Sequence, residues 1–277
     1  MYTYLPHITC IYIGMMDTLL LIWRNFLIVL AIFNISTFLY IITTLTSIKN
    51  NFAVIAGIPY VFQTTWRCFF ISEYVNRQTI YFTKWNSPLV ARLLAFLGEF
   101  CFGIQLSMTF WKRWNVHPGL PSILSPTFVC ISLVLLNFTG QLCATTGIAL
   151  RDNFFFLLEG MLWAVMFVLQ ILSALDHIVL PYYYHSIDES IYFWMFLLFA
   201  SFFAILYQTM LYCPMCYYDW KVQRHNRSLS IRNIFLGLQD AHSKQRVTRR
   251  WKDWKNEWIW QSLYFSFGTW ACLYMMI

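Results

Sequence analysis

Two cysteines with a spacing suited to thiol chemistry, Cys213 and Cys216, occur in a Cys-Pro-Met-Cys sequence at the end of an apolar stretch. A Cys-x-x-Cys pair can lower the pKa of one thiol and cycle through a disulfide, which makes a membrane thiol oxidoreductase one alternative. Palmitoylation of two juxtamembrane cysteines is a second alternative, and inert interfacial cysteines are a third. A zinc site would need two more ligands, and His225 is the one nearby candidate.

Polar side chains also occur inside apolar stretches long enough to cross a bilayer, namely Arg92, Glu99, Gln105 and Glu159. Charged groups at that depth are costly and face protein or water rather than lipid. We expect Arg92 and Glu159, each a few residues inside its span from the same membrane face, to pair across helices. Glu99 either lines a path for protons, ions or headgroups, as in a transporter or channel, or is protonated or hydrogen-bonded to a neighbour such as Gln141.

The loop from Ala174 to Ser190 carries five side chains that could in principle collect a metal ion: Asp176, His177, His185, Asp188 and Glu189. The neighbouring Pro181 and the three tyrosines after it favour an interfacial turn instead, so we predict neither a metal nor a cofactor. The sequence lacks the histidine clusters of membrane di-iron enzymes, the His-x4-Asp acyltransferase pattern, a Gly-rich phosphate loop and a Gly-x-Ser-x-Gly elbow. These features favour a protein without enzymatic activity.

Most of the positive charge lies in one segment close to the end of the chain. Residues 217–257 hold ten of the nineteen Lys and Arg residues against four acids, a local net charge of +6 out of +7 for the protein. Basic residues beside a membrane span are retained on the cytoplasmic side, so we predict a cytoplasmic segment over 213–257.

Two helical patterns recur within that segment. Ile231, Ile234, Phe235, Leu238 and Ala241 predict an amphipathic helix lying on the headgroup surface. Val247 and three tryptophans follow at steps of four, three and four residues, which predicts a helix running into the last span. The residues expected to contact phospholipid are Arg246, Arg249, Arg250, Trp251, Lys252, Trp254, Lys255 and Trp258. Tryptophans beside a span favour headgroups over nucleic acid, so no nucleic-acid partner is predicted.

Composition determines the class of protein that must position these groups. Of the 277 residues, 59% are apolar and 11% are charged. That is too little charge to cover the surface of a soluble globular protein. We predict one all-α membrane domain over 1–277, a polytopic helical bundle of six to seven spans. The segment 1–23 is expected to lie at the interface, and the expected spans are 26–46, 52–71, 88–111, 126–148, 153–173, 191–212 and 258–277.

The span 52–71 is the uncertain one, because Gly57 and Pro59 interrupt it and Gln63 and Arg67 lie within it. The side of the amino terminus depends on it. The carboxyl terminus is expected to be lumenal or extracellular, in the endoplasmic reticulum or the plasma membrane.

Short connections, polar groups within spans and abundant aromatic residues together favour one function. We predict an accessory subunit of a larger membrane protein that binds or handles phospholipid, as in lipid transfer. A transporter or channel is the first alternative and the thiol oxidoreductase is the second.

Overall fold

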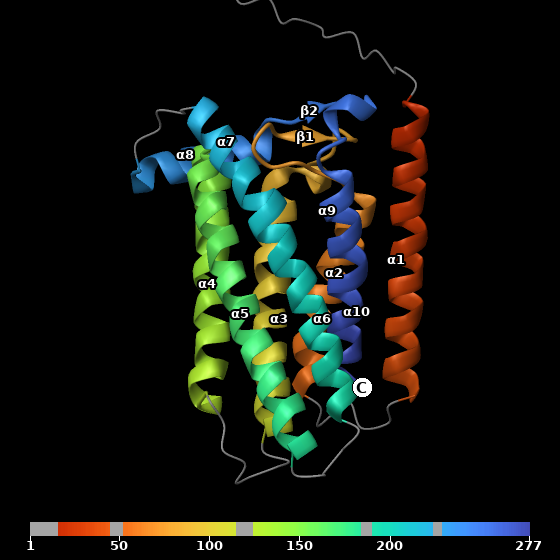
Figure 1. The fold of residues 1–277 in the computed structure, drawn as a ribbon. Helices are drawn as coiled ribbons and strands as arrows, with labels where there is room; N and C mark the ends of the chain where they lie inside the picture. The colour runs from red at the N-terminus through yellow and green to blue at the C-terminus, as the bar shows by residue number, and fades with distance from the viewer. Residues whose placement is uncertain (1–15, 45–51, 115–123, 184–189, 224–228) are drawn as a thin grey trace, which may run out of the picture.

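Helical rods that run side by side make up most of the structure, a computed structural model that describes residues 16–44, 52–114, 124–183, 190–223 and 229–277 (Figure 1). Five rods are α1 (Thr18–Thr44), α2 (Phe52–Phe69), α3 (Pro88–Trp114), α4 (Pro126–Leu150) and α5 (Asn153–Tyr183). The sixth joins α6 (Ser190–Tyr207) through a π-helical turn (Gln208–Tyr212) to α7 (Cys213–Gln223). The seventh joins α9 (Trp258–Leu263) through a second π-helical turn (Tyr264–Gly268) to α10 (Thr269–Tyr274). The all-α bundle predicted from the sequence is therefore confirmed.

Five helices are long and apolar enough to cross a membrane, which makes this a multi-pass membrane protein: Thr18–Thr44, Pro88–Lys112, Pro126–Leu150, Asn153–Ile178 and Ile191–Val222. Helix α2 and the α9–α10 rod fall outside that set, so the six or seven spans remain a prediction. Helix α2 is unbroken at Pro59 and has ten of its 18 residues buried. A helix surrounded by other helices needs less apolar surface than one facing lipid.

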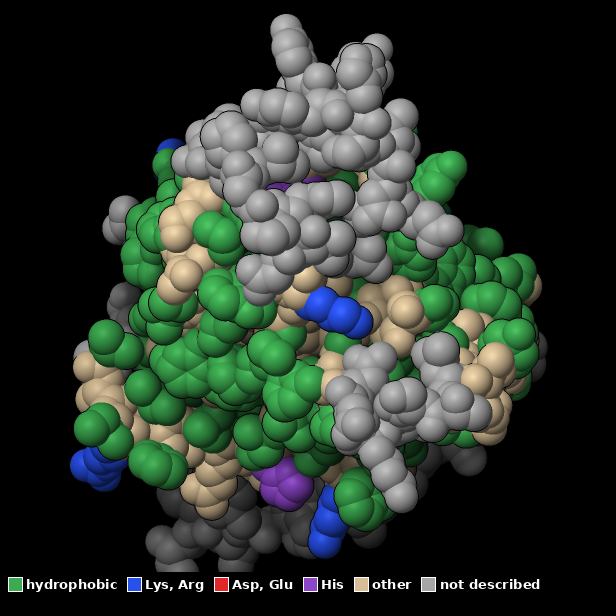
Figure 2. Space-filling model, turned by 90° about the horizontal axis from the view of Figure 1, so that it is seen from below, with side chains coloured by type: hydrophobic (Ala, Val, Ile, Leu, Met, Phe, Trp, Pro, Cys, Tyr) green, Lys and Arg blue, Asp and Glu red, His purple; other side chains and the backbone are tan. Residues whose placement is uncertain are grey.

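The connections divide the bundle into two ends (Figure 1). One end carries the start of α1, the α2–α3 connection, the α4–α5 turn and the segment from α7 to α9, and we call it the basic end. The other carries the carboxyl terminus, and we call it the opposite end. At the opposite end, aromatic and aliphatic side chains from several helices form a dry cluster that includes Phe110, Trp114, Phe193, Trp194 and Met275. Hydrophobic side chains dominate the described surface there (Figure 2).

Helix α1 starts earlier than expected. The prediction of an interfacial segment over 1–23 is wrong for 18–23, which form the first turns of α1, while residues 1–15 lie outside the described part of the chain. Leu20, Trp23 and Leu27 are buried at helical spacing, which holds these turns against the bundle. Asp17 fixes the start, because its amide donates to the carbonyl of Arg249 (3.1 Å) and its carboxylate accepts from the amide of Trp251 (2.7 Å).

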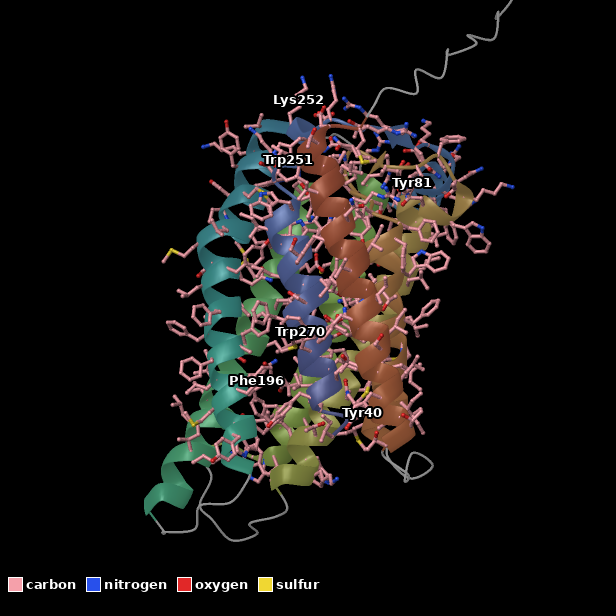
Figure 3. All side chains as sticks on the ribbon, turned by 90° about the vertical axis from the view of Figure 1, so that its right-hand side faces the viewer. Tyr40, Tyr81, Phe196, Trp251, Lys252 and Trp270 are labelled. Atoms are coloured by element: carbon pink, nitrogen blue, oxygen red, sulfur yellow. The ribbon has the colours of Figure 1, made fainter. Side chains whose placement is uncertain are left out.

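The first and last rods are directly bonded to each other. The Asn34 amide donates to the carbonyl of Phe265 (2.9 Å) and accepts from the Trp270 indole (3.1 Å), and the Trp23 indole donates to Ser262 Oγ (3.1 Å). Figure 3 shows Trp270 of α10 close to α1. The bundle is thus joined between segments more than 200 residues apart in sequence.

The prediction of a helix from Val247 through the tryptophans into the last span is wrong. Strand β2 (Arg246–Val247) instead pairs in parallel with β1 (Gln78–Thr79), a short 3-10 turn covers Trp251–Asp253, and α9 begins at Trp258. The cause is that backbone carbonyl groups of the α2–α3 connection are available to accept hydrogen bonds from this segment. The amide of Arg246 donates to the carbonyl of Arg77 (2.8 Å), and the amide of Thr248 donates to that of Thr79 (3.0 Å).

The amphipathic helix predicted around residue 235 is present as α8 (Ile231–Ser243), which lies across the basic end (Figure 1). Ser230 caps it by accepting from the amide of Asn233 (3.1 Å). A Cβ on Gly237 would lie 1.8 Å from the carbonyl oxygen of Ala149, so the two backbones touch at the end of α4. Ala241 faces inward, whereas Ile231 and Phe235 are 77% and 69% exposed.

Ion pairs hold α8 in place. The carboxylate of Asp240 lies 2.8 Å from Arg151 Nη2, 2.7 Å from Lys244 Nζ and 3.9 Å from Arg77 Nε. Arg77 is 2% exposed and also donates to the carbonyl of Ile148 (2.7 Å). Burial alone would raise the pKa of Asp240, but the Lys244 hydrogen bond and the three positive charges together lower it below its ordinary value.

Candidate functional site

Glu99, near the middle of α3, is the centre of a buried polar network. Its carboxylate accepts from Gln141 Nε2 of α4 (2.5 Å) and from the Tyr264 hydroxyl of the last rod (2.5 Å). Arg67 Nη1 of α2 lies 3.9 Å from the same carboxylate. The glutamate is 5% exposed, and four rods therefore meet at one carboxylate.

The network continues from Gln141 toward the basic end. Its Oε1 accepts from Arg92 Nη2, and Arg92 Nη1 lies 4.0 Å from Glu159 Oε1 of α5. The Tyr212 hydroxyl then donates to Glu159 (3.3 Å). The predicted pairing of Arg92 with Glu159 is present, and of the alternatives considered for Glu99 the hydrogen bond to Gln141 is present as well. A buried ion needs such partners because desolvation costs several kcal/mol per charge.

Helix α3 can place both charges inward for two reasons. Arg92 and Glu99 are seven residues apart, which puts them on one face of the helix. Glycines also let the neighbouring helices approach closely, as small residues do in membrane bundles. A Cβ on Gly98 would lie 2.2 Å from Gln63 Cγ of α2, and one on Gly103 would lie 2.9 Å from Asn137 Cγ of α4.

Gln105, the fourth predicted intramembrane residue, lies apart from this network. It is fully buried and bonds the last rod, because its Nε2 donates to the carbonyl of Cys272 (2.9 Å) and its Oε1 accepts from the Cys272 thiol (3.0 Å). Gln105 therefore joins α3 to α10.

Arg67 is the member of the network that sequence reasoning did not assign to a site. Its guanidinium carbon lies 5.2–5.8 Å from the ring centroids of Tyr74, Trp260, Tyr264 and Phe265. Aromatic faces attract a cation most strongly where water is excluded. A charge inside an uncertain span was the signal that could have identified it. Tyr212 and Tyr264 gave no such signal, because nothing in the sequence distinguishes them from the other tyrosines among the seventeen.

A cavity of about 170 Å³ lies between this network and the basic end. It is lined by the α2–α3 connection, the start of α5, the α7 rod and the segment before α9. The lining residues are Ser72, Glu73, Tyr74, Val75, Asn76, Gln78, Asn153, Phe156, Tyr212, Met215, Cys216, Asp219, Asp253, Asn256, Glu257 and Trp260. Tyr74, Tyr212 and Trp260 belong to both the cavity wall and the surroundings of the network.

Two glutamates in the cavity wall, Glu73 and Glu257, have raised pKa values. Glu73 accepts from the amides of Val75 (2.7 Å) and Asn76 (2.9 Å), and Glu257 accepts from Trp260 Nε1 (2.7 Å) and Gln261 Nε2 (3.0 Å). Burial, together with the negative charge of Glu73, raises the pKa of Glu257 to about 7. Burial also raises the pKa of Glu73.

The two cysteines of the Cys-Pro-Met-Cys sequence lie inside the continuous α6–α7 rod. Both thiols are free. Cys213 packs against Gly160 of α5, while Cys216 is 5% exposed and lines the cavity. Burial leaves the sulfur of Cys216 without the surface access that lipidation needs.

The predicted headgroup contacts divide by exposure. Arg246, Arg250, Lys252, Lys255 and Trp258 are exposed at the basic end, and Arg249 and Trp251 are half-buried. Figure 3 shows Trp251 and Lys252 at this end of the bundle. Trp254 is fully buried, with its ring 6.1 Å from that of Trp23 and its indole N–H donated to the carbonyl of Thr248 (3.2 Å). Trp254 is thus a core residue.

Of the five side chains considered for a metal, two lie in the described part of the chain. The ring of His177 stacks on Trp194 at 4.0 Å, and Asp176 is 5% exposed. His185, Asp188 and Glu189 lie outside the described residues. Among the described residues, no group of three or more His, Cys, Asp and Glu is arranged to hold a metal ion.

Comparison of the chain with protein-family models, with curated proteins and with solved structures finds no match.

Proposed function

We propose that this protein is a non-enzymatic phospholipid-binding membrane protein whose basic end rests against an anionic leaflet. One observation carries the proposal: α8 lies across the end of the bundle with an apolar edge exposed beside basic side chains. A helix of this kind buries its apolar edge at the boundary between headgroups and acyl chains.

The exposed edge of α8 consists of Ile231, Phe235 and Leu236, with Leu229 just before the helix. Arg232 is exposed on the same helix, and Lys252 and Lys255 are exposed elsewhere on the basic end. Each basic residue near an anionic surface contributes about 1 kcal/mol to binding. Apolar burial and charge attraction therefore act on the same end of the protein.

The amount of anionic lipid that the purified protein retains tests this proposal. The double variant Arg232→Gln/Lys252→Gln removes about 2 kcal/mol of attraction, on the order of a thirty-fold loss of affinity for phosphatidylglycerol over phosphatidylcholine. Native mass spectrometry of the protein purified in gentle detergent measures the two lipids retained. The control, Lys112→Gln/Arg113→Gln, removes equal charge at the opposite end and should leave retention unchanged. Equal retention in all three proteins would contradict the proposal.

The proposed orientation follows from the same charges. The basic end faces the cytoplasm, of the endoplasmic reticulum or plasma membrane, and the carboxyl terminus faces the lumen or the outside. Because the start of α1 is bonded to Arg249 and Trp251, the amino-terminal end of α1 faces the cytoplasm as well.

A larger membrane partner is the second part of the proposal. Every described rod presents large apolar side chains outward, for example Phe33 on α1, Phe203 on α6 and Phe267 on the last rod. Such surfaces suit broad helix contacts. Purification in gentle detergent from the native source should recover a second membrane chain in constant ratio, and recovery of the protein alone would contradict this part.

The buried network favours a transporter or channel as a second candidate. A chain of charged and amide groups runs from Glu99 to Tyr212, which lines the cavity at the basic end, while the apolar cluster seals the opposite end. Such a one-sided polar path suits proton or ion movement. Proton or ion flux in reconstituted liposomes that vanishes in Glu99→Gln would support this candidate. A wild-type protein that gives no flux would exclude it.

A further inference from the structure

We infer that the cavity between the buried network and the basic end binds a small organic ammonium group, such as the amine end of a phospholipid headgroup. The inference rests on the proposed function and names the chemistry that one part of it would recognise. It stands on the charge of the cavity wall, on unpaired polar atoms within it and on its aromatic faces.

The wall of the cavity is acidic. Four carboxylates line it, from Glu73, Asp219, Asp253 and Glu257, and no Lys, Arg or His of the described chain does so. Asp253 has a partner in Arg250, whose Nε lies 3.1 Å away. Asp219 forms no ion pair with any described residue. A cationic ligand would therefore meet a wall whose charged side chains, among the described residues, are carboxylates alone, with Asp219 free of any ion pair to a described residue.

Two polar side chains in the wall are buried without a hydrogen-bond partner. They are Ser72, 4% exposed, through Oγ, and Gln78, 8% exposed, through Oε1. The Tyr74 hydroxyl, also in the wall, is a third unpaired atom. Leaving such a buried group without a hydrogen-bond partner is unfavourable. All three oxygens can accept a hydrogen bond, which the N–H of a primary ammonium such as ethanolamine supplies, whereas the trimethylammonium group of choline has no N–H.

Aromatic rings complete the wall. Tyr74, Tyr212 and Trp260 line the cavity, and Tyr74 and Trp260 already lie 5.4 Å and 5.8 Å from the guanidinium carbon of Arg67. Aromatic faces combined with carboxylates recognise alkylated ammonium groups. Tyr74 and Trp260 thus belong both to the cavity wall and to the surroundings of Arg67.

Size restricts the ligand to a small group. Pockets for drug-sized ligands measure about 300–1,000 Å³, whereas this cavity measures about 170 Å³. It suits ethanolamine, choline or the amine end of a headgroup rather than a whole lipid.

Calorimetric titration of the detergent-purified protein with choline chloride or ethanolamine hydrochloride tests the inference, with sodium chloride at equal ionic strength as reference. Wild type should bind both cations, and ethanolamine more tightly, because choline has no N–H to donate to the unpaired oxygens. At pH 8, above the pKa of about 7 of Glu257, Asp219→Asn and Glu257→Gln should each weaken binding about ten-fold, because each removes one carboxylate charge. Trp220→Phe, a control beside Asp219 that does not line the cavity, should bind like wild type. Thermal unfolding identifies any variant that has lost its fold. Asp219 is the milder position, because Glu257 accepts hydrogen bonds from Trp260 and Gln261 that Glu257→Gln would alter.

A second arm identifies the source of the amine. In phosphatidylcholine nanodiscs, a headgroup in the cavity should weaken choline binding relative to phosphatidylglycerol nanodiscs. Equal binding in both would assign the cavity to a soluble amine. Heat signals no larger than those of sodium chloride, or binding unaffected by both carboxylate variants, would overturn the inference. Retention of anionic lipid by the Arg232 and Lys252 variants reports on the proposed function separately, so the two can fail independently.

Discussion

At the scale of single residues, the charges inside the bundle are the features most sensitive to change. Arg92 and Glu159 are 3% and 8% exposed, and each has the other as its opposite charge. Removing one partner of such a pair leaves an uncompensated ion, which costs more than the pair itself contributes.

We expect Arg92→Met to lower the free energy of unfolding by about 3 kcal/mol, because Glu159 loses its counter-charge. The exchange Arg92→Glu/Glu159→Arg should recover part of that loss. Denaturant titration in detergent measures all three proteins, with Lys112→Gln as the exposed control. Wild-type stability in Arg92→Met and in Glu159→Met would show that the pair has no structural role.

Glu257 predicts a pH dependence of stability. Its pKa is raised from the ordinary 4.5 to about 7, so the folded protein disfavours the ionised form. Stability from this group should therefore fall as pH rises from about 4.5 to 7, by on the order of 2–3 kcal/mol. Thermal unfolding across this pH range should show a flatter profile in Glu257→Gln than in wild type. Parallel profiles would contradict the expectation.

Asp240 works in the opposite direction, because its pKa is lowered by the cations around it. The stability that it contributes is present above its unfolded pKa and is lost as pH falls through the folded one. Acid should therefore loosen α8 only below the ordinary Asp pKa of 3.8, a pH at which Glu257 is already protonated.

At the scale of elements, α8 depends on one close approach. The Cβ of Gly237→Ala would meet the carbonyl of Ala149 at 1.8 Å, and backbone cannot move aside as a flexible side chain can. We expect this variant to release α8 although alanine is the better helix former by about 1 kcal/mol. Faster hydrogen exchange over 231–243 is the measurement. Gln239→Ala, exposed on the same helix, should leave exchange unchanged, and equal protection in both variants would contradict the close approach.

Local sequence patterns predicted these elements unequally. The spacing from Ile231 to Ala241 correctly indicated α8, because one helix on a surface needs no information beyond its own period. The spacing from Val247 to Trp258 is equally helical, yet the chain pairs there with β1, about 170 residues earlier. A partner that distant leaves no trace in a local window.

The candidate site shows the same limit. Arg92, Glu99 and Glu159 were identifiable because charges are rare in apolar spans, and their need for partners predicted their pairing. The tyrosines that complete the network lie at or beside π-helical turns, at Tyr212 and Tyr264, and the sequence gives no signal for such turns. The cavity depends on four separate segments and could not be predicted from any one of them.

At the scale of the whole molecule, the proposed orientation can be tested by labelling. Lys252→Cys and an added cysteine after Ile277 should react with an impermeant maleimide from opposite sides of sealed vesicles, with Lys252→Cys on the cytoplasmic side. The wild-type protein gives the background from its own eight cysteines. Labelling of both positions from one side would exclude the proposed arrangement of ends.

The bonds between α1 and the last rod have a consequence for biosynthesis. The partners of Asn34 and Trp23 are Phe265, Trp270 and Ser262, which leave the ribosome long after α1 has done so. Helix α1 therefore lacks these hydrogen-bond partners until residues 262–270 have been synthesised. A stop codon before Trp258 should leave that helix exposed to the quality-control machinery of the membrane, even though every apolar span upstream is intact.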